Sequence, residues 1–216
     1  MKKAISILLF FATLGFASAQ ITHTAGGGKV DQNAEKILKA AAKNFSGKAV
    51  SMTVTMVNKD TQKRETGRMN ADVLYFNGKF RVSFDGNVIY CDGNSTWHWN
   101  KDVDEVTVSK MSSNDDDLMN PAAILANYSK NYNAKFIRTE QNGDNIIDLT
   151  PKKSKSYYKI RLTINNNIPQ KMVMHNYDSS AGEFIISNFK TGVKTSDTDF
   201  TFPKAQNPNV EIIDMR

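Results

Sequence analysis

Apolar and polar residues alternate one by one through most of this chain, which is the pattern of half-buried β-strands. The segment 67–110 shows the pattern clearly, for example in the run from Phe80 to Phe84. Turn pairs such as Asn77-Gly78 and Asp85-Gly86 separate the alternating runs. These pairs favour tight hairpins, because both of their positions tolerate a positive φ. We therefore predict a series of short antiparallel strands over this segment.

The same alternation continues on both sides of the segment. Further strands are predicted at 50–58, 134–140, 145–150, 157–165, 169–177 and 182–190. Two other stretches repeat apolar residues every three or four positions, which predicts amphipathic helices at 31–45 and 121–130. Asp31 is suited to cap the first helix, and Asn120-Pro121 is suited to start the second.

The number of predicted strands limits the fold classes that are possible. We predict a mainly β (α+β) chain with about eleven antiparallel strands, which is too many for one flat open sheet. A strongly curved sheet that forms an incomplete β-barrel is the natural arrangement, with the two helices packed against it. The end of the chain, through Arg216, is expected either to pair as an edge strand or to remain loose.

The N-terminus has the features of a secretory signal peptide. Two lysines precede an apolar run, and Ala17-Ser18-Ala19 offers a small-residue cleavage site. We expect residues 1–19 to be removed, residues 20–30 to form a flexible glycine-containing leader, and residues 31–216 to form one domain. No cysteine follows the cleavage site, so lipidation of the exported chain is not expected.

Composition favours binding over catalysis. Without the two signal lysines, 26 basic residues stand against 22 acidic ones. The basic residues are scattered along the chain, so nucleic-acid binding is not expected.

Cys91 is the only cysteine, which excludes an internal disulfide and predicts a buried thiol. His23, His98 and His175 lack metal-ligand spacing, and the acidic loop 114–117 lacks the calcium-loop pattern. With no nucleophile elbow or phosphate loop, we predict no catalytic residue, metal or cofactor.

Bulky side chains are predicted to gather on one face of the sheet. They come in pairs: Met52 and Met56, Phe80 and Phe84, Trp97 and Trp99, Met172 and Met174. Any one of them can belong to a core beneath the helices, but two short helices cannot cover so broad a face. A half-closed barrel leaves a cavity that is packed, dry or occupied by a ligand. His98 is expected on the face opposite to the tryptophans, as a surface or edge residue.

The order of these features resembles that of the outer-membrane lipoprotein carrier family, LolA. The resemblance spans roughly residues 31–203, and it depends on the ordered set of segments because no single motif is specific. The segments are the strand opening at Gly67, Lys79-Phe80-Arg81, Asp92-Gly93 followed by Trp97-His98-Trp99-Asn100, Asn120-Pro121, residues 141–144 leading into 149–152, and Phe200-Thr201-Phe202-Pro203.

This resemblance implies an unclosed barrel with helices as a lid over an apolar cavity. Family members act in the periplasm of Gram-negative bacteria, where they accept acylated lipoproteins from an inner-membrane ABC-type complex and pass them to an outer-membrane receptor. That receptor is itself a lipoprotein, so the lack of a lipid-anchor cysteine favours a soluble, monomeric carrier. The residues that the resemblance implies for lipid binding are Phe80, Val82, Phe84, Ile124, Leu125, Trp97, Trp99, Met52 and Val54.

One turn departs from the family pattern. Members often carry an arginine before the segment matching Phe80, where it ties the lid to the barrel, but this chain has Phe76-Asn77-Gly78-Lys79. The sequence therefore leaves open which residue ties the lid to the barrel, which receptor the protein uses and which cargo it carries. An alternative is a lipid-binding or lipoprotein-sensing scaffold of the same fold, which would have a rigid, fully packed interior. A hydrolase would instead show a Ser–His or His–carboxylate cluster in a cleft.

Overall fold

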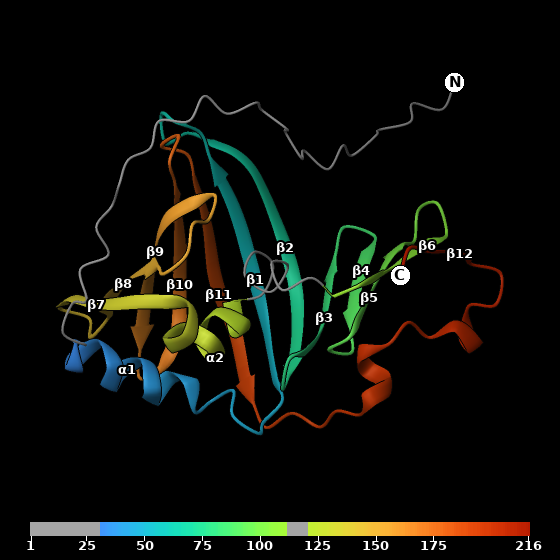
Figure 1. Cartoon of the computed structure of the whole chain (residues 1–216), viewed down its shortest axis with the longest axis horizontal. Helices are drawn as coiled ribbons and strands as arrows, with labels where there is room; N and C mark the ends of the chain where they lie inside the picture. The colour runs from blue at the N-terminus through green and yellow to red at the C-terminus, as the bar shows by residue number, and fades with distance from the viewer. Residues whose placement is uncertain (1–30, 112–120) are drawn as a thin grey trace.

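The computed structural model describes residues 31–111 and 121–216 (Figure 1). The predictions of a signal peptide and leader in 1–30, of an acidic loop at 114–117 and of a helix cap at Asn120 lie outside the described residues.

The helices and strands follow the predicted ranges closely. The α-helices are α1 (Gln32–Ala42) and α2 (Pro121–Asn131). The strands are β1 (Val50–Lys59), β2 (Glu65–Phe76), β3 (Lys79–Phe84), β4 (Asn87–Cys91), β5 (Ser95–Asn100), β6 (Glu105–Lys110), β7 (Tyr132–Thr139), β8 (Asn145–Pro151), β9 (Tyr157–Asn165), β10 (Ile168–Asn176), β11 (Ala181–Thr191) and β12 (Glu211–Asp214). Two short 3₁₀ helices, η1 (Asp197–Phe200) and η2 (Lys204–Gln206), precede β12.

Within the described residues, twelve strands form one sheet in the order β12-β6-β5-β4-β3-β2-β1-β11-β10-β9-β8-β7. Neighbouring strands are antiparallel except for β12, which pairs in parallel with β6. The sheet curves strongly around the two helices without closing, so β7 and β12 remain as edges (Figure 1). The predicted mainly β, incomplete barrel is confirmed. The chain's end supplies the strand beyond the expected eleven.

Hairpin turns set the register of the central strands. Asn77 and Gly78 have φ values of 47° and 85° between β2 and β3, the conformation that a two-residue hairpin needs. Asn166 and Asn167, with φ values of 48° and 64°, make the equivalent turn between β9 and β10. Asparagine tolerates this conformation better than most side chains, which explains why these residues end the strands.

The main core lies on the face of the sheet that carries the helices, here called the inner face. α1 contributes Ala34, Leu38 and Ala41 to this core, and α2 contributes Ile124 and Leu125. Their spacing places them on one side of each helix, as the sequence pattern predicts. Strands β1 to β4 and β7 to β11 supply most of the rest of this cluster, including Cys91, whose predicted burial is confirmed.

The opposite, outer face holds a second apolar cluster, and it contains both tryptophans. Trp97 and Trp99 pack there with Phe202, and the Trp99 and Phe202 ring centroids lie 5.3 Å apart. The prediction that the tryptophans share a face with Phe80 is wrong. Cross-strand pairing aligns Phe80 with Cys91 and Cys91 with Thr96, so the next residue, Trp97, points the other way.

An ion-pair network on the outer face predicts acid sensitivity. Asp148 accepts hydrogen bonds from Arg161 Nε at 2.7 Å and Nη2 at 2.8 Å, and Lys159 Nζ lies 3.5 Å away. Burial alone raises the pKa of Asp148, but Arg161 and then Lys159 outweigh it, so the pKa lies below its ordinary value of 3.8. This contribution to stability is therefore present above pH 3.8 and is lost as the pH falls through the folded-state pKa.

We expect Asp148→Asn to lower the free energy of unfolding at pH 7 by about 1.5–3 kcal/mol, the range for hydrogen bonds to charged groups. The difference from the wild type should shrink once the pH is below 3.8, because the wild-type carboxyl group then becomes protonated. Urea denaturation at a series of pH values measures both. A difference that stays constant with pH would show that the charge of Asp148 does not stabilise the fold.

Candidate apolar binding site

An open cavity of about 930 Å³ lies on the inner face, at the end of the sheet formed by the β1–β2 and β10–β11 hairpins. This end lies opposite α1, at the top of Figure 1. The apolar residues that line the cavity include Met56, Met69, Met174, Ala181 and Phe184. The cavity wall is mainly apolar, while turn residues such as Asp60 and Ser180 form its polar rim.

Strand pairing brings the apolar side chains of the cavity wall together. Met56 on β1 lies opposite both Met69 on β2 and Phe184 on β11. Met172 on β10 continues the row, since it lies opposite Phe184. Residues directly opposite each other share a face of the sheet. Because methionine side chains are flexible and polarisable, this wall can adapt to apolar ligands of different shapes.

Two glycines keep the outer part of the cavity wide. Asn58 lies between Gly67 and Gly182 in the pairing of β2, β1 and β11. A Cβ atom at residue 182 would lie 3.5 Å from Phe184 Cε2, and one at residue 67 would lie 3.8 Å from Asn58 Nδ2. These are ordinary contact distances, so both positions have room for a side chain. The lack of side chains therefore leaves space where the cavity opens.

α1 covers the other end of the inner face and is fastened at both of its ends. Asp31 Oδ1 accepts hydrogen bonds from the backbone N–H of Asn33 and Ala34, at 3.1 and 3.0 Å. Asp31 Oδ2 accepts one from the backbone N–H of Phe136 on the edge strand β7, at 2.9 Å. The bonds from Ala34 and Phe136 lower the pKa of Asp31 despite partial burial, so the carboxylate keeps both roles at neutral pH.

The C-terminal end of α1 is held by amide and hydroxyl groups. Asn44 Nδ2 donates to Asn167 O at 2.9 Å, and Thr191 Oγ1 donates to Asn44 O at 3.0 Å. α1 thus bridges the β7 edge and the β9–β10 turn without an arginine.

The two oxygens of Asp31 allow the helix cap to be separated from the strand contact. In Asp31→Asn, Oδ1 can still cap α1, but the amide group facing Phe136 N–H cannot accept its hydrogen bond. We expect faster hydrogen exchange at Phe136 in this variant, with protection of the first turn of α1 retained. Asp31→Ala should lose protection at both places. Equal exchange at Phe136 in the wild type and Asp31→Asn would contradict the strand contact.

Six of the predicted lipid-binding residues lie together, but beneath the helices and not in the open cavity. These are Met52, Val54, Phe80, Val82, Ile124 and Leu125, each no more than 7% exposed. Phe84 is half-buried beside them. Trp97 and Trp99 lie apart from them on the outer face.

The residues at the open end of the cavity were only partly predictable from the sequence. Met56 and Met174 belong to the predicted apolar pairs, whereas Met69, Phe184 and the two glycines were not predicted to line a cavity. The two-residue period that runs through Gly67 and Met69 into the core position Ala71 is the signal that identifies this part of the wall.

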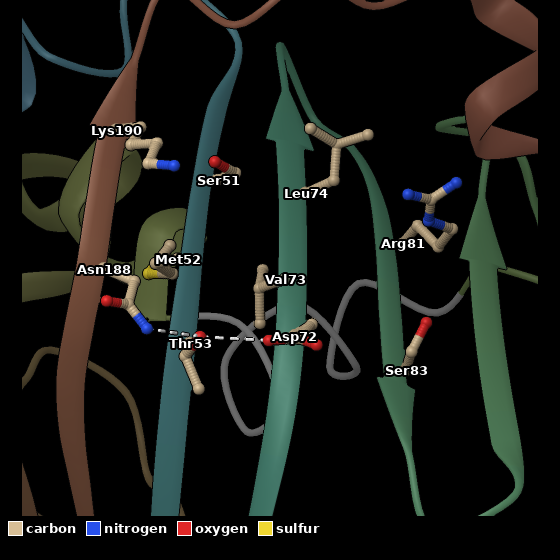
Figure 2. Close-up of a pocket in the computed structure, with 10 residues that line it drawn as sticks. All are labelled: Ser51, Met52, Thr53, Asp72, Val73, Leu74, Arg81, Ser83, Asn188 and Lys190. Carbon is tan, nitrogen blue, oxygen red and sulfur yellow. Dashed lines mark hydrogen bonds between the residues drawn. The ribbon is translucent and has the colours of Figure 1, made fainter.

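A second hollow, of about 280 Å³, lies on the outer face and has a different character (Figure 2). Asn188 Nδ2 donates to Thr53 Oγ1 at 3.3 Å, and Thr53 Oγ1 donates to Asp72 Oδ1 at 3.0 Å. Figure 2 shows this row of side chains crossing β11, β1 and β2. Its polar groups satisfy one another, as on the solvated side of an antiparallel sheet, so this hollow does not suit an acyl chain.

The histidines in the described ranges give no indication of an active site. His98 Nε2 lies 3.3 Å from Asn87 Oδ1, and His175 Nε2 is buried without a hydrogen-bond partner. Burial lowers the pKa of both residues below the ordinary value of 6.5. His98 is half-buried on the face of Val82, so the prediction that it points away from the tryptophans is confirmed.

Neither a metal-binding cluster nor a membrane-spanning helix occurs in the described residues. No group of three or more His, Cys, Asp or Glu residues among them is placed to hold a metal ion. None of the helices in these ranges has the length and apolar character needed to cross a membrane.

The model of the family described as outer membrane lipoprotein carrier protein LolA matches residues 53–203. An uncharacterized conserved protein from Thermus thermophilus has a similar fold, with a TM-score of 0.57, 14% identity, and coverage of 85% of this chain and 99% of that chain. A LolA superfamily protein from Nitrosomonas europaea gives a TM-score of 0.47 and 17% identity, over 78% of this chain and 97% of that one. The MucA/MucB complex of Pseudomonas aeruginosa gives a TM-score of 0.40 and 13% identity, over 79% of this chain and 61% of that one. No curated protein matches the chain significantly.

Proposed function

The chain belongs to the outer membrane lipoprotein carrier family LolA, and from this starting point we propose that it binds the acyl chains of lipoproteins or lipids and carries them across the periplasm. The observation that carries the proposal is the open, mainly apolar cavity on the inner face of the sheet. The cavity lies on the same face as the buried residues beneath α1 and α2, so an acyl chain that enters it can extend toward the interior.

The free energy of burial favours this role. Each methylene group moved from water into an apolar site contributes about 0.8 kcal/mol. An acylated protein in water would therefore aggregate or return to a membrane unless its chains were shielded. The methionine-rich wall suits chains of varied length and branching, because methionine adapts its shape to the ligand.

The predicted interior residues become a second compartment when the helices move. Phe80, Val82, Met52 and Val54 form its sheet wall, with Phe84 at its margin. Ile124 and Leu125 cover it. Exposing one buried leucine or isoleucine costs about 1.5–3 kcal/mol, which burial of two to four methylenes offsets. An acyl chain can thus replace the contacts that the helices lose.

Trp97 and Trp99 are not part of this proposed site, because the C-terminal segment covers them on the outer face. Asp31 and Asn44, at the two ends of α1, take the role that an arginine plays in other members of the family. Their bonds are few and are exposed or only part-buried, which suits a covering helix that must also release its ligand.

As a periplasmic carrier, the chain would be exported by residues 1–19, and residues 31–216 would act as one monomeric domain. It would receive its cargo from an inner-membrane ABC-type complex and deliver it to an outer-membrane receptor. Its function requires no catalytic residue, metal or cofactor.

Isothermal titration calorimetry of the exported chain, residues 20–216, tests the proposal. A triacylated lipopeptide and the same peptide without acyl chains serve as ligands. We expect saturable binding of the acylated form only, with a negative heat-capacity change from apolar burial. Equal binding of both peptides would favour the alternative of a scaffold that recognises protein. Release of free fatty acid during the titration would favour the hydrolase.

A further inference from the structure

A pair of exposed tyrosines stands beside the cavity opening. Tyr177, in the β10–β11 turn, is 67% exposed, and Tyr158, at the start of β9, is 42% exposed. Their ring centroids lie 5.7 Å apart. Asn176 and Ser156, near these tyrosines in the sequence, line the cavity rim, and the Tyr158 ring packs against His175 on the outer side of the same end of the sheet. A ring with an apolar body and a polar hydroxyl is suited to a boundary between water and lipid.

The loops around the opening carry an excess of positive charge. We call residues 59–68, 153–159 and 175–183 the mouth loops, and they contain seven basic and four acidic side chains. Three of the acidic side chains already pair within these loops, as Asp60 with Arg64, Glu65 with Arg68, and Glu183 with Lys59. Of the other cations, Lys159 pairs with Asp148 outside the loops, while Lys153 and Lys63 are exposed. Lys63 Nζ donates to Ser179 O and so links two of the loops.

We propose that the mouth loops dock on a membrane surface that contains anionic phospholipid. This inference rests on the proposed function, because an acyl chain leaving a bilayer must otherwise cross water before it reaches the cavity. With the cavity opening held against the bilayer, the acyl chain passes directly from the apolar interior of the bilayer into the apolar cavity. The tyrosines would lie at the level of the headgroups, and the lysines would attract their negative charge.

Vesicle co-sedimentation of the exported chain tests the docking. We expect binding to vesicles of phosphatidylcholine mixed with phosphatidylglycerol, and little binding to phosphatidylcholine alone. Binding should weaken as salt is raised from about 50 mM to about 500 mM, because salt screens the attraction. Equal binding to both vesicles, or binding to neither, would overturn the proposal. In the second case, a protein partner would be the better occupant of this surface.

Two pairs of variants locate the surface. Lys63→Glu with Lys153→Glu should weaken binding to the anionic vesicles about tenfold or more. The matched control, Lys43→Glu with Lys48→Glu, makes the same charge change at two exposed positions that precede the first residue of β1, whereas the mouth loops begin at its last residue. Vesicle binding by this control should stay within about twofold of the wild type. Equal losses in the two variants would overturn the assignment to the mouth loops.

The aromatic pair has its own control. Tyr158→Ser with Tyr177→Ser should weaken vesicle binding, whereas Val103→Ser with Met215→Ser should not. Val103 and Met215 are also exposed, but they lie between β5 and β6 and after β12, strands that Figure 1 shows far from the end of the sheet that holds the opening. Circular dichroism checks that each variant folds. If the tyrosine double variant does not fold, the lysine double variant still tests the docking surface.

Titration with a soluble acylated lipopeptide separates this inference from the proposed function. The mouth-loop variants should bind the lipopeptide like the wild type, because their side chains lie outside the apolar wall. Loss of both vesicle and lipopeptide binding would make these residues part of the cavity and would overturn a separate docking role. A wild type that sediments with anionic vesicles but binds no lipopeptide would refute the proposed function and leave the docking surface in place.

Discussion

Gly182→Trp should block acyl-chain binding while leaving the protein folded. The backbone at Gly182 does not require a positive φ, and a new Cβ atom would meet only the edge of the Phe184 ring, at 3.5 Å. The indole would therefore extend into the cavity. Displacing about four methylenes at about 0.8 kcal/mol each costs about 3 kcal/mol, or roughly a 100-fold loss of affinity.

Ile185→Trp is the matched control for this variant. Ile185 lies on the same strand as Gly182, at an exposed position between the buried residues Phe184 and Ile186, so its side chain lies on the outer face. It receives the same side chain and should bind lipopeptide like the wild type. Calorimetry gives the affinities, and thermal melting checks the fold. If Gly182→Trp binds normally, the open cavity does not hold the acyl chain.

Ile124→Asp should destabilise the folded protein severely. Ile124 is fully buried in the main core, so a carboxylate there would be taken out of water and placed in an apolar cluster. We expect a loss of about 4 kcal/mol or more in the free energy of unfolding. Ile124→Val removes only one methyl group and should cost about 0.5–1.5 kcal/mol.

Ser129→Asp places the same charge at an exposed position of α2 and should change stability by no more than about 0.5 kcal/mol. Urea denaturation measures all three variants. If Ile124→Asp keeps its stability and loses only lipopeptide binding, then α2 is a loosely packed cover in solution, and its inner side faces ligand space instead of the core.

The strands could be predicted from the sequence because their signals are local. Alternation from Phe80 to Phe84 and a turn at Asn77-Gly78 need no knowledge of distant residues. The helices were predictable for the same reason, since Asp31 supplies a cap at the start of an amphipathic repeat. The incomplete barrel then followed from the number of strands and their short connections.

The faces of separate strands could not be predicted in this way. Whether Trp97 lies on the side of Phe80 depends on how β4 pairs with β5 across the turn at residues 92–94. A shift of one residue in that register reverses every side chain of the strand. The position of Trp97 and Trp99 on the outer face therefore required the structure.

The open end of the cavity was hard to find for a different reason. Gly67 and Gly182 shape it by lacking side chains, and an absent side chain gives no hydrophobic signal in a sequence. They become informative only when strand pairing places them on either side of Asn58. The mouth loops likewise meet only in the folded chain.

Native mass spectrometry tests the central claim most directly. The exported chain is mixed with a triacylated lipoprotein or with the same lipoprotein lacking its acyl chains. We predict a one-to-one complex with the acylated form alone, because the apolar cavity recognises the lipid and not the protein. A complex of equal abundance with the unacylated form would contradict this account and would assign the chain to protein recognition.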